Sequence, residues 1–129
     1  MSELLEPVAA ELRDIGLNPK IVNFPGVGWS PQGIVIDVAV QTGKYKGQVI
    51  KVGISFQENS YPEYPPHFVH LKASVKTTNI TRHSEHKFAN EEWYAYSLPP
   101  SDFWDGLDQS QKNMKTYYHR HLQKILDKL

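Results

Sequence analysis

Two pairs of histidines in the carboxy-terminal half are the first candidates for chemistry. His83 and His86 lie in a polar stretch from Ala73 to Glu92, while His119 and His121 lie in a segment with helical spacing. Zinc needs three or four converging ligands. Residues two apart on a helix face different sides, so His119 and His121 are poor co-ligands. We therefore expect no metal and no cofactor. A proton-shuttle role for His83 is a second hypothesis.

The absence of cysteine is the strongest restriction on chemistry. It excludes disulfides, thiolate metal sites and a cysteine nucleophile. The 129 residues, 40% of them hydrophobic, suffice for one packed domain over 1–129. Fourteen basic and fourteen acidic residues give no net charge, so a nucleic-acid partner is not expected. No apolar run approaches the roughly 18 residues of a membrane span, and no basic signal region is visible, so we predict a cytoplasmic protein with no membrane contact.

Hydrophobic spacing predicts the elements that must position such residues. Leu5, Val8, Leu12 and Ile15 follow helical spacing, and another helix is predicted from near Asp108 to Leu129. Strands are predicted over 20–24, 34–41, 49–56 and 67–71, whereas Ala73 to Glu92 shows no clean period and is interpreted as irregular. The expected fold is α+β: an N-terminal helix, a four-stranded antiparallel meander and a C-terminal helix.

A proline-rich bend between the last two predicted strands carries a resemblance. Val49 to Phe56 is followed by Tyr61-Pro62-Glu63-Tyr64-Pro65-Pro66, and an apolar strand comes next. Proline fixes φ and disfavours helix before it, so Pro62, Pro65 and Pro66 predict a rigid turn. Tyr61 can pack its ring on that turn. This order resembles the ubiquitin-conjugating enzyme (UBC) superfamily, and the resemblance implies a UBC-like fold over the whole chain.

The carboxy-terminal third is similar to a divergent bacterial branch of that superfamily. The residues concerned are Trp93 to Ser97, Phe103-Trp104 and Asn113 to His119. The genes of that branch resemble sets that encode ubiquitin-like modifiers and activating enzymes, and several such sets resemble antiphage defence systems. The resemblance implies those two proteins as partners.

The catalytic position of the superfamily has no matching nucleophile here. Asn79 matches an asparagine that, in active members, can donate a hydrogen bond to the oxyanion of a thioester under attack. A turn-capping role for Asn79 is the alternative. The catalytic cysteine would fall near His86 or Lys87, and neither an imidazole nor an amine forms an equivalent labile thioester. The resemblance thus marks the region from Asn79 through His83 to Lys87 as the candidate site.

These observations predict a UBC-like protein of a ubiquitin-like modification pathway that binds a modifier or an activating enzyme without thioester transfer. Two alternatives remain open. The first is an active conjugating enzyme whose cysteine has been replaced in this chain, with Lys87 suited to trapping an isopeptide mimic. The second is a protein-interaction scaffold that resembles RWD domains. Whether the protein is an enzyme therefore stays open at this point.

Overall fold

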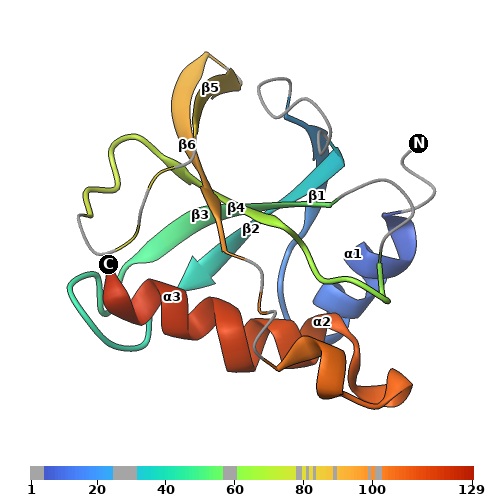
Figure 1. Cartoon of the computed structure of the whole chain (residues 1–129). Coiled ribbons are helices and arrows are strands. Elements are labelled where there is room, and N and C mark those ends of the chain that lie inside the picture. The colour runs from blue at the N-terminus through green and yellow to red at the C-terminus, as the bar shows by residue number, and fades with distance from the viewer. Residues whose placement is uncertain are drawn as a thin grey trace.

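The protein is built on one antiparallel sheet with helices at both ends of the chain. A computed structural model describes residues 5–24, 32–56, 61–77, 80, 82, 84–88, 90–98, 100 and 103–129. The strands are β1 (Lys20–Asn23), β2 (Gln32–Ala39), β3 (Val49–Phe56), β4 (Phe68–Lys72), β5 (Ser84–Phe88) and β6 (Glu91–Ser97). They are arranged in the order β1-β2-β3-β4-β6-β5, so β1 and β5 are the two edges. The sheet curls into a half-barrel, with β1–β2 and β5–β6 rising on either side of the central strands (Figure 1).

Helix α1 begins and ends where sequence signals place it, and the carboxy-terminal end of the chain is built of several short helical segments. Helix α1 (Glu6–Asp14) has Pro7 in its first turn, where a missing N–H is tolerated, and ends before Gly16, whose φ is +88°. Its buried residues are Val8, Ala9 and Leu12. At the other end of the chain, the short turns η2 (Trp104–Gly106) and η3 (Gln109–Gln111) precede α2 (Met114–Tyr117), a π-type turn η4 (Tyr118–Leu122) and α3 (Gln123–Lys128).

The predicted start of the closing helix near Asp108 is wrong, because the helix starts at Met114. The Asn113 side chain accepts a hydrogen bond from the Thr116 N–H and caps it. The π-type turn adds one residue, so Leu122 follows Tyr117 on the buried face where a regular helix would place His121.

The predicted four-stranded, UBC-like meander is wrong, because the sheet has six strands. The two additional strands, β5 and β6, form an antiparallel hairpin in which Ser84 is opposite Ala95 and His86 is opposite Trp93. The inward positions of β5 are polar, Ser84 and His86, and alternate with exposed Glu85 and Lys87. Four of the five residues of β5 are polar, so 84–88 has no hydrophobic period, and the sequence alone predicts an irregular segment there.

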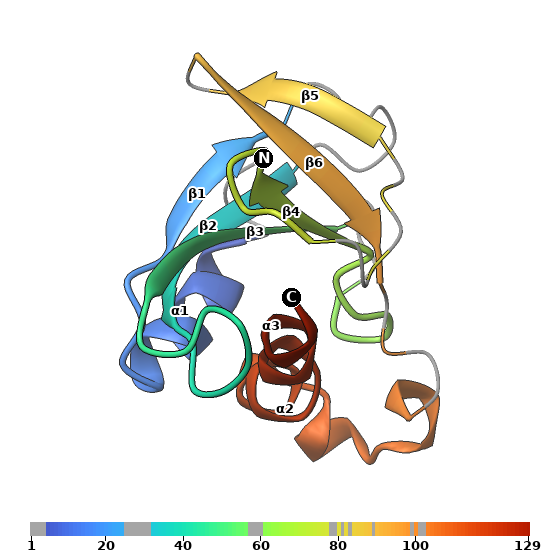
Figure 2. The same ribbon diagram turned by 90° about the vertical axis from the view of Figure 1, so that its left-hand side faces the viewer.

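One face of the sheet, here called the helix face, packs against both terminal helices. Alternate residues of four strands point to it; they are Ile34, Ile36 and Val38 of β2, Ile50, Val52 and Ile54 of β3, Val69 and Leu71 of β4, and Tyr96 of β6. Met114, Leu122 and Leu126 of the closing helix pack against them, and all three are fully buried. Figure 2 shows this helix nearly end-on beneath the arch of the central strands. This is the main hydrophobic core, because it combines the apolar faces of the sheet and both helices.

The opposite face, here called the Phe24 face, carries a second and smaller core. It consists of Phe24, Val35, Phe68, Trp93 and Ala95, with Val22 packed against them. The ring of Phe24 lies over the backbone of β2 and β3, where a Cβ on Gly33 or Gly53 would come within 2.6 Å of that ring. Only glycine leaves room for Phe24 there, so these two strand glycines are a packing requirement.

Replacing Gly53 by alanine should destabilise the protein by about 1–3 kcal/mol, the usual cost of overpacking a filled core. The new methyl group would also come within 3.0 Å of the Cβ of His70, so Phe24 and His70 would both have to move. The free energy of unfolding in urea measures the effect. Gly106→Ala is the matched control, because a Cβ there has nothing within 4 Å. Equal stability of the two variants would contradict this account of the second core.

Candidate functional site

A buried chain of hydrogen bonds crosses three strands on the Phe24 face. Ser55 Oγ of β3 lies 2.8 Å from Nε2 of His70 in β4. His70 Nδ1 lies 3.0 Å from Nε2 of His86 in β5. Ser55 and His70 are fully buried, and His86 is 8% exposed. The two histidines belong to strands that are separated by β6, so the curl of the sheet brings them together.

The rings around this chain form an apolar enclosure. Phe24 stacks on His70 with ring centroids 4.0 Å apart and planes 14° apart. The same ring meets His86 edge-on at 5.3 Å. Ser55 pairs with Gly33 across β2 and with Phe68 across β4, so its hydroxyl lies among neighbours that exclude water. The enclosure therefore favours uncharged histidines.

Burial lowers the pKa of both histidines. The pKa of His70 falls to about 3, first because its ring is desolvated and second because His86 is beside it. Desolvation also lowers the pKa of His86. Both rings are neutral at pH 7, and each carries one N–H. The hydrogen bond between His70 and His86 uses one of these protons, so all hydrogen bonds of the chain are donated in the same direction. Whichever tautomer is present, His86 Nδ1 is the buried end of the chain and has no hydrogen-bond partner among the described residues.

The order serine, histidine, histidine is the order of a nucleophile, a base and an orienting group. Substrate access is the missing requirement, because Ser55 has no exposed surface and Phe24 covers His70. The arrangement therefore does not act as a hydrolytic site in this structure. Its chemistry suits a structural role, in which hydrogen bonds between otherwise costly buried polar groups fix β5 against β3 and β4.

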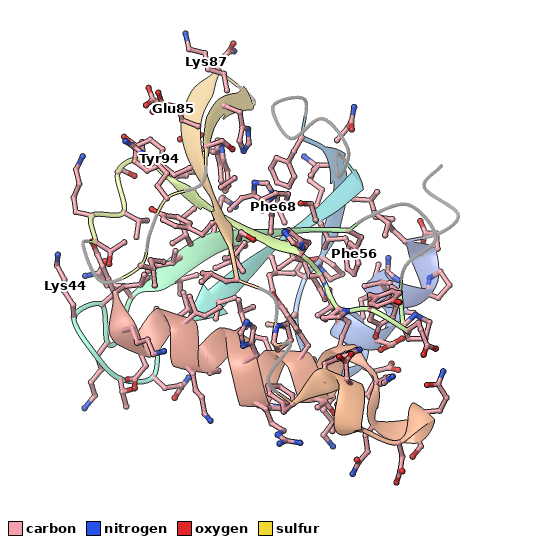
Figure 3. The ribbon with its side chains drawn as sticks, viewed as in Figure 1. Lys44, Phe56, Phe68, Glu85, Lys87 and Tyr94 are labelled. Atoms are coloured by element: carbon pink, nitrogen blue, oxygen red, sulfur yellow. The ribbon has the colours of Figure 1, made fainter. Side chains whose placement is uncertain are left out.

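The structure separates the site residues predicted from the sequence. Asn79 and His83 lie outside the described residues. His86 points into the Phe24 face, whereas Lys87 is exposed on the outer side of β5. Figure 3 shows Glu85 and Lys87 at the outer margin of the β5–β6 hairpin, pointing away from the rest of the protein. His86 and Lys87 are strand neighbours on opposite faces, so these two cannot act on one reacting group.

The proline bend is fixed to both helical ends of the chain. The Tyr61 hydroxyl donates to Glu11 Oε1 of α1 at 2.9 Å, and the same oxygen accepts from the Met114 N–H at 2.7 Å. Trp104 Nε1 donates to the Pro62 carbonyl at 3.1 Å. Burial and then the Glu11 carboxylate raise the pKa of Tyr61, so its hydroxyl stays protonated as a donor. Pro65 and Pro66 complete the bend before β4, and Pro66 is buried.

The other two histidine candidates do not meet. His121 Nε2 donates to the Leu98 carbonyl at 2.6 Å, whereas His119 is exposed. In the described ranges, no three His, Asp or Glu side chains gather so that they could hold a metal ion. Nor does any helix in these ranges have the length and apolar character to cross a bilayer.

Sequence reasoning missed Ser55 and His70, the two residues at the centre of the buried chain. Both occupy positions between the apolar residues that predict these strands, and those apolar residues point to the opposite face. A usable signal was present, since Gly53 and Ser55 are small or polar at alternate positions opposite the apolar Ile54 and Phe56. Such an alternation indicates that something large covers that face.

Comparison with known proteins gives no relative from which to transfer a function, since no family model, curated protein or solved structure matches the chain.

Acid should weaken the fold through His70. Its pKa is lower in the folded than in the unfolded protein, so the unfolded chain binds more protons below about pH 6.5. Stability is then lost as the pH falls from about 6.5 towards 3, by up to about 1.4 kcal/mol per pH unit from this residue. Urea unfolding at a series of pH values should show a shallower loss for His70→Gln than for the unaltered protein. His119→Gln, at an exposed site, should keep the original slope. Identical slopes for all three would refute the assignment.

Proposed function

We propose that the protein is a binding domain of a ubiquitin-like modification pathway and that it acts without forming a thioester. The observation that carries this proposal is where β5 places the side chains of His86 and Lys87. The resemblance places the nucleophile near His86 or Lys87, and the chain has no cysteine. His86 is buried and hydrogen-bonded to His70, and Lys87 is exposed to solvent. A modifier can be bound at such a surface but not carried by it.

The position of β5 also favours binding. It is an edge of the sheet and pairs with β6 alone within the described ranges. The outer edge of such a strand offers backbone N–H and C=O groups to an extended segment of another protein. The flexible carboxy-terminal tail of a ubiquitin-like protein is a segment of this kind. Glu85 and Lys87 point outward beside this edge and would orient the tail by charge, while affinity would come from apolar contacts elsewhere.

The anchored proline bend is a second support. Its hydrogen bonds hold the bend before β4 against α1 and Trp104. Tyr61, Pro62, Pro65 and Pro66 therefore act as a brace. This fits a domain that presents a rigid surface to partners.

The first test concerns chemistry. We would incubate the protein with ATP and with the activating enzymes and ubiquitin-like proteins encoded in the same genome. No adduct that a thiol reductant cleaves should form, because a thioester needs a thiolate. Gel electrophoresis with and without reductant measures this, and a known conjugating enzyme with its own modifier serves as the positive control. A reducible band would overturn the proposal.

The second test concerns binding. Titrating the same ubiquitin-like proteins into isotope-labelled protein should shift the amide signals of 79–87 before those of Lys44 to Lys46. These two regions are distinguishable because Lys44 and Lys87 lie at separate corners of the molecule (Figure 3). The chain has no net charge to accelerate encounter, so a micromolar constant, about −8 kcal/mol, is expected. Shifts confined to the Lys44 to Lys46 turn, or no shift at millimolar partner, would favour the scaffold alternative.

A further inference from the structure

Two lysines stand side by side on the Phe24 face without a carboxylate between them. Val52 of β3 is opposite Leu71 of β4, so one step further along this register Lys51 is opposite Lys72. Like charges directly across a strand pair are destabilising. Each lysine is balanced only on its far side, Lys51 by Asp37 and Lys72 by Glu91, both at 3.0 Å. Each lysine of the pair is thus neutralised on one side, and a carboxylate placed between them would share or replace these partners.

Two pockets meet at this pair of lysines. The first has a volume of about 180 Å³ and is lined on its apolar side by Val22, Val35 and Trp93, with Lys20 at its margin. The second, of about 340 Å³, extends along β3 past Tyr45, Val49 and Val75. Lys51 and Lys72 line both pockets. The two hollows are therefore halves of one surface, here called the lysine groove, in which apolar walls flank a cationic centre.

The charges of the lysine groove fit an anionic occupant. Its lining contains Lys20, Lys51 and Lys72 together with Glu91, and Asp37 pairs with Lys51 beside it, so these side chains have an excess of one positive charge. In the described part of the chain Lys20 has no carboxylate within ion-pair distance. Val49 is 68% exposed, a high value for a large apolar side chain next to a charged pocket. Two neighbouring lysines and an apolar side chain in solvent are both unfavourable in the free protein, and a partner that supplies carboxylates and apolar side chains would relieve both.

We propose that the lysine groove binds an extended acidic segment of a partner protein. A carboxylate of that segment would lie between Lys51 and Lys72. One apolar side chain would enter the pocket of Val22, Val35 and Trp93, and another would cover Val49. This proposal goes beyond the proposed function and does not rest on it, since the groove spans β1 to β4 and β6 rather than the edge of β5.

A protein segment fits this surface better than a nucleic acid. Binding to a nucleic-acid backbone relies on a surplus of positive charge, and the chain as a whole has none. Base stacking needs an exposed aromatic face, but Trp93 is 2% exposed. The groove presents apolar and charged side chains in turn, which matches an extended peptide whose acidic and apolar residues alternate at every second position and so share one face.

The test uses a short, end-blocked peptide in which leucine and glutamate alternate at every second position, with serine between them, titrated into the full chain at low salt. Amide shifts should centre on Lys51, Lys72 and Trp93, and affinity should fall as salt is raised. The double variant Lys51→Gln with Lys72→Gln should bind at least about tenfold more weakly, equivalent to about 1.4 kcal/mol. Lys115→Gln with Lys124→Gln makes the same change in net charge at two exposed helix positions and should bind as the unaltered protein does.

A gain of affinity supplies the complementary readout. Asp37→Asn with Glu91→Gln frees both lysines from their present partners, so the peptide should bind severalfold more tightly. Thermal unfolding of every variant shows whether the fold is retained, and this variant tests the proposal even if the lysine variant is unstable. The proposal fails if the two lysine variants bind alike, if the peptide gives no shift at millimolar concentration, or if an oligothymidylate of equal charge binds more tightly than the peptide.

Discussion

The structure depends on one constraint, which is that the central strands carry apolar side chains on both faces, and both faces must be covered. The closing helix covers one face, with Met114, Leu122 and Leu126 against β2 to β4. No helix covers the other face in the part of the chain described, so the sheet covers it by curling until Phe24 and Trp93 share one small core. Gly33 and Gly53 make that curl possible, because they let the Phe24 ring lie directly on the strands. The hydrophobic effect favours the removal of apolar side chains on both faces from water. Close packing favours the arrangement in which the Phe24 ring fills the space over the two glycines.

Polar groups inside the second core determine how its strands align. Ser55, His70 and His86 form one chain of hydrogen bonds from the middle of the sheet to its edge. Each would be costly to bury alone, so a slip of β5 that separated His86 from His70 would leave unpaired polar atoms. The edge strand is thereby held in one register although it has few apolar residues of its own. The same pairing withdraws His86 from any chemistry with a substrate and leaves only the outward side of β5 for contact with a partner.

The described surface offers two different kinds of binding site. The outer edge of β5 is suited to backbone pairing, and the lysine groove is suited to a charged partner. The outer edge of β5 displays Glu85 and Lys87, one of each sign, and so has no strong electrostatic preference. The lysine groove gathers three lysines beside two carboxylates, Asp37 and Glu91, in a chain whose total charge is zero. Partners of different chemistry would therefore use different parts of the molecule, one recognised by strand pairing and one by charge and shape.

The sequence by itself determined the N-terminal helix, the presence but not the start of the closing helix, β1 to β4, the proline bend and the absence of thiol chemistry. Each of these depends on local signals: the spacing of Leu5, Val8 and Leu12, the alternation from Ile50 to Phe56, the ring constraint of Pro62, Pro65 and Pro66, and residue types that are present or missing. The tertiary structure alone decided that 84–88 is a strand, that His86 points inward to meet His70, and that Lys51 and Lys72 share one groove. The reason is that β5 has no hydrophobic period, so its conformation is stabilised by distant partners: Trp93 and Ala95 across the hairpin, and His70 across the curl. Contacts between residues far apart in the chain exist only after the sheet has curled, and no local pattern encodes them.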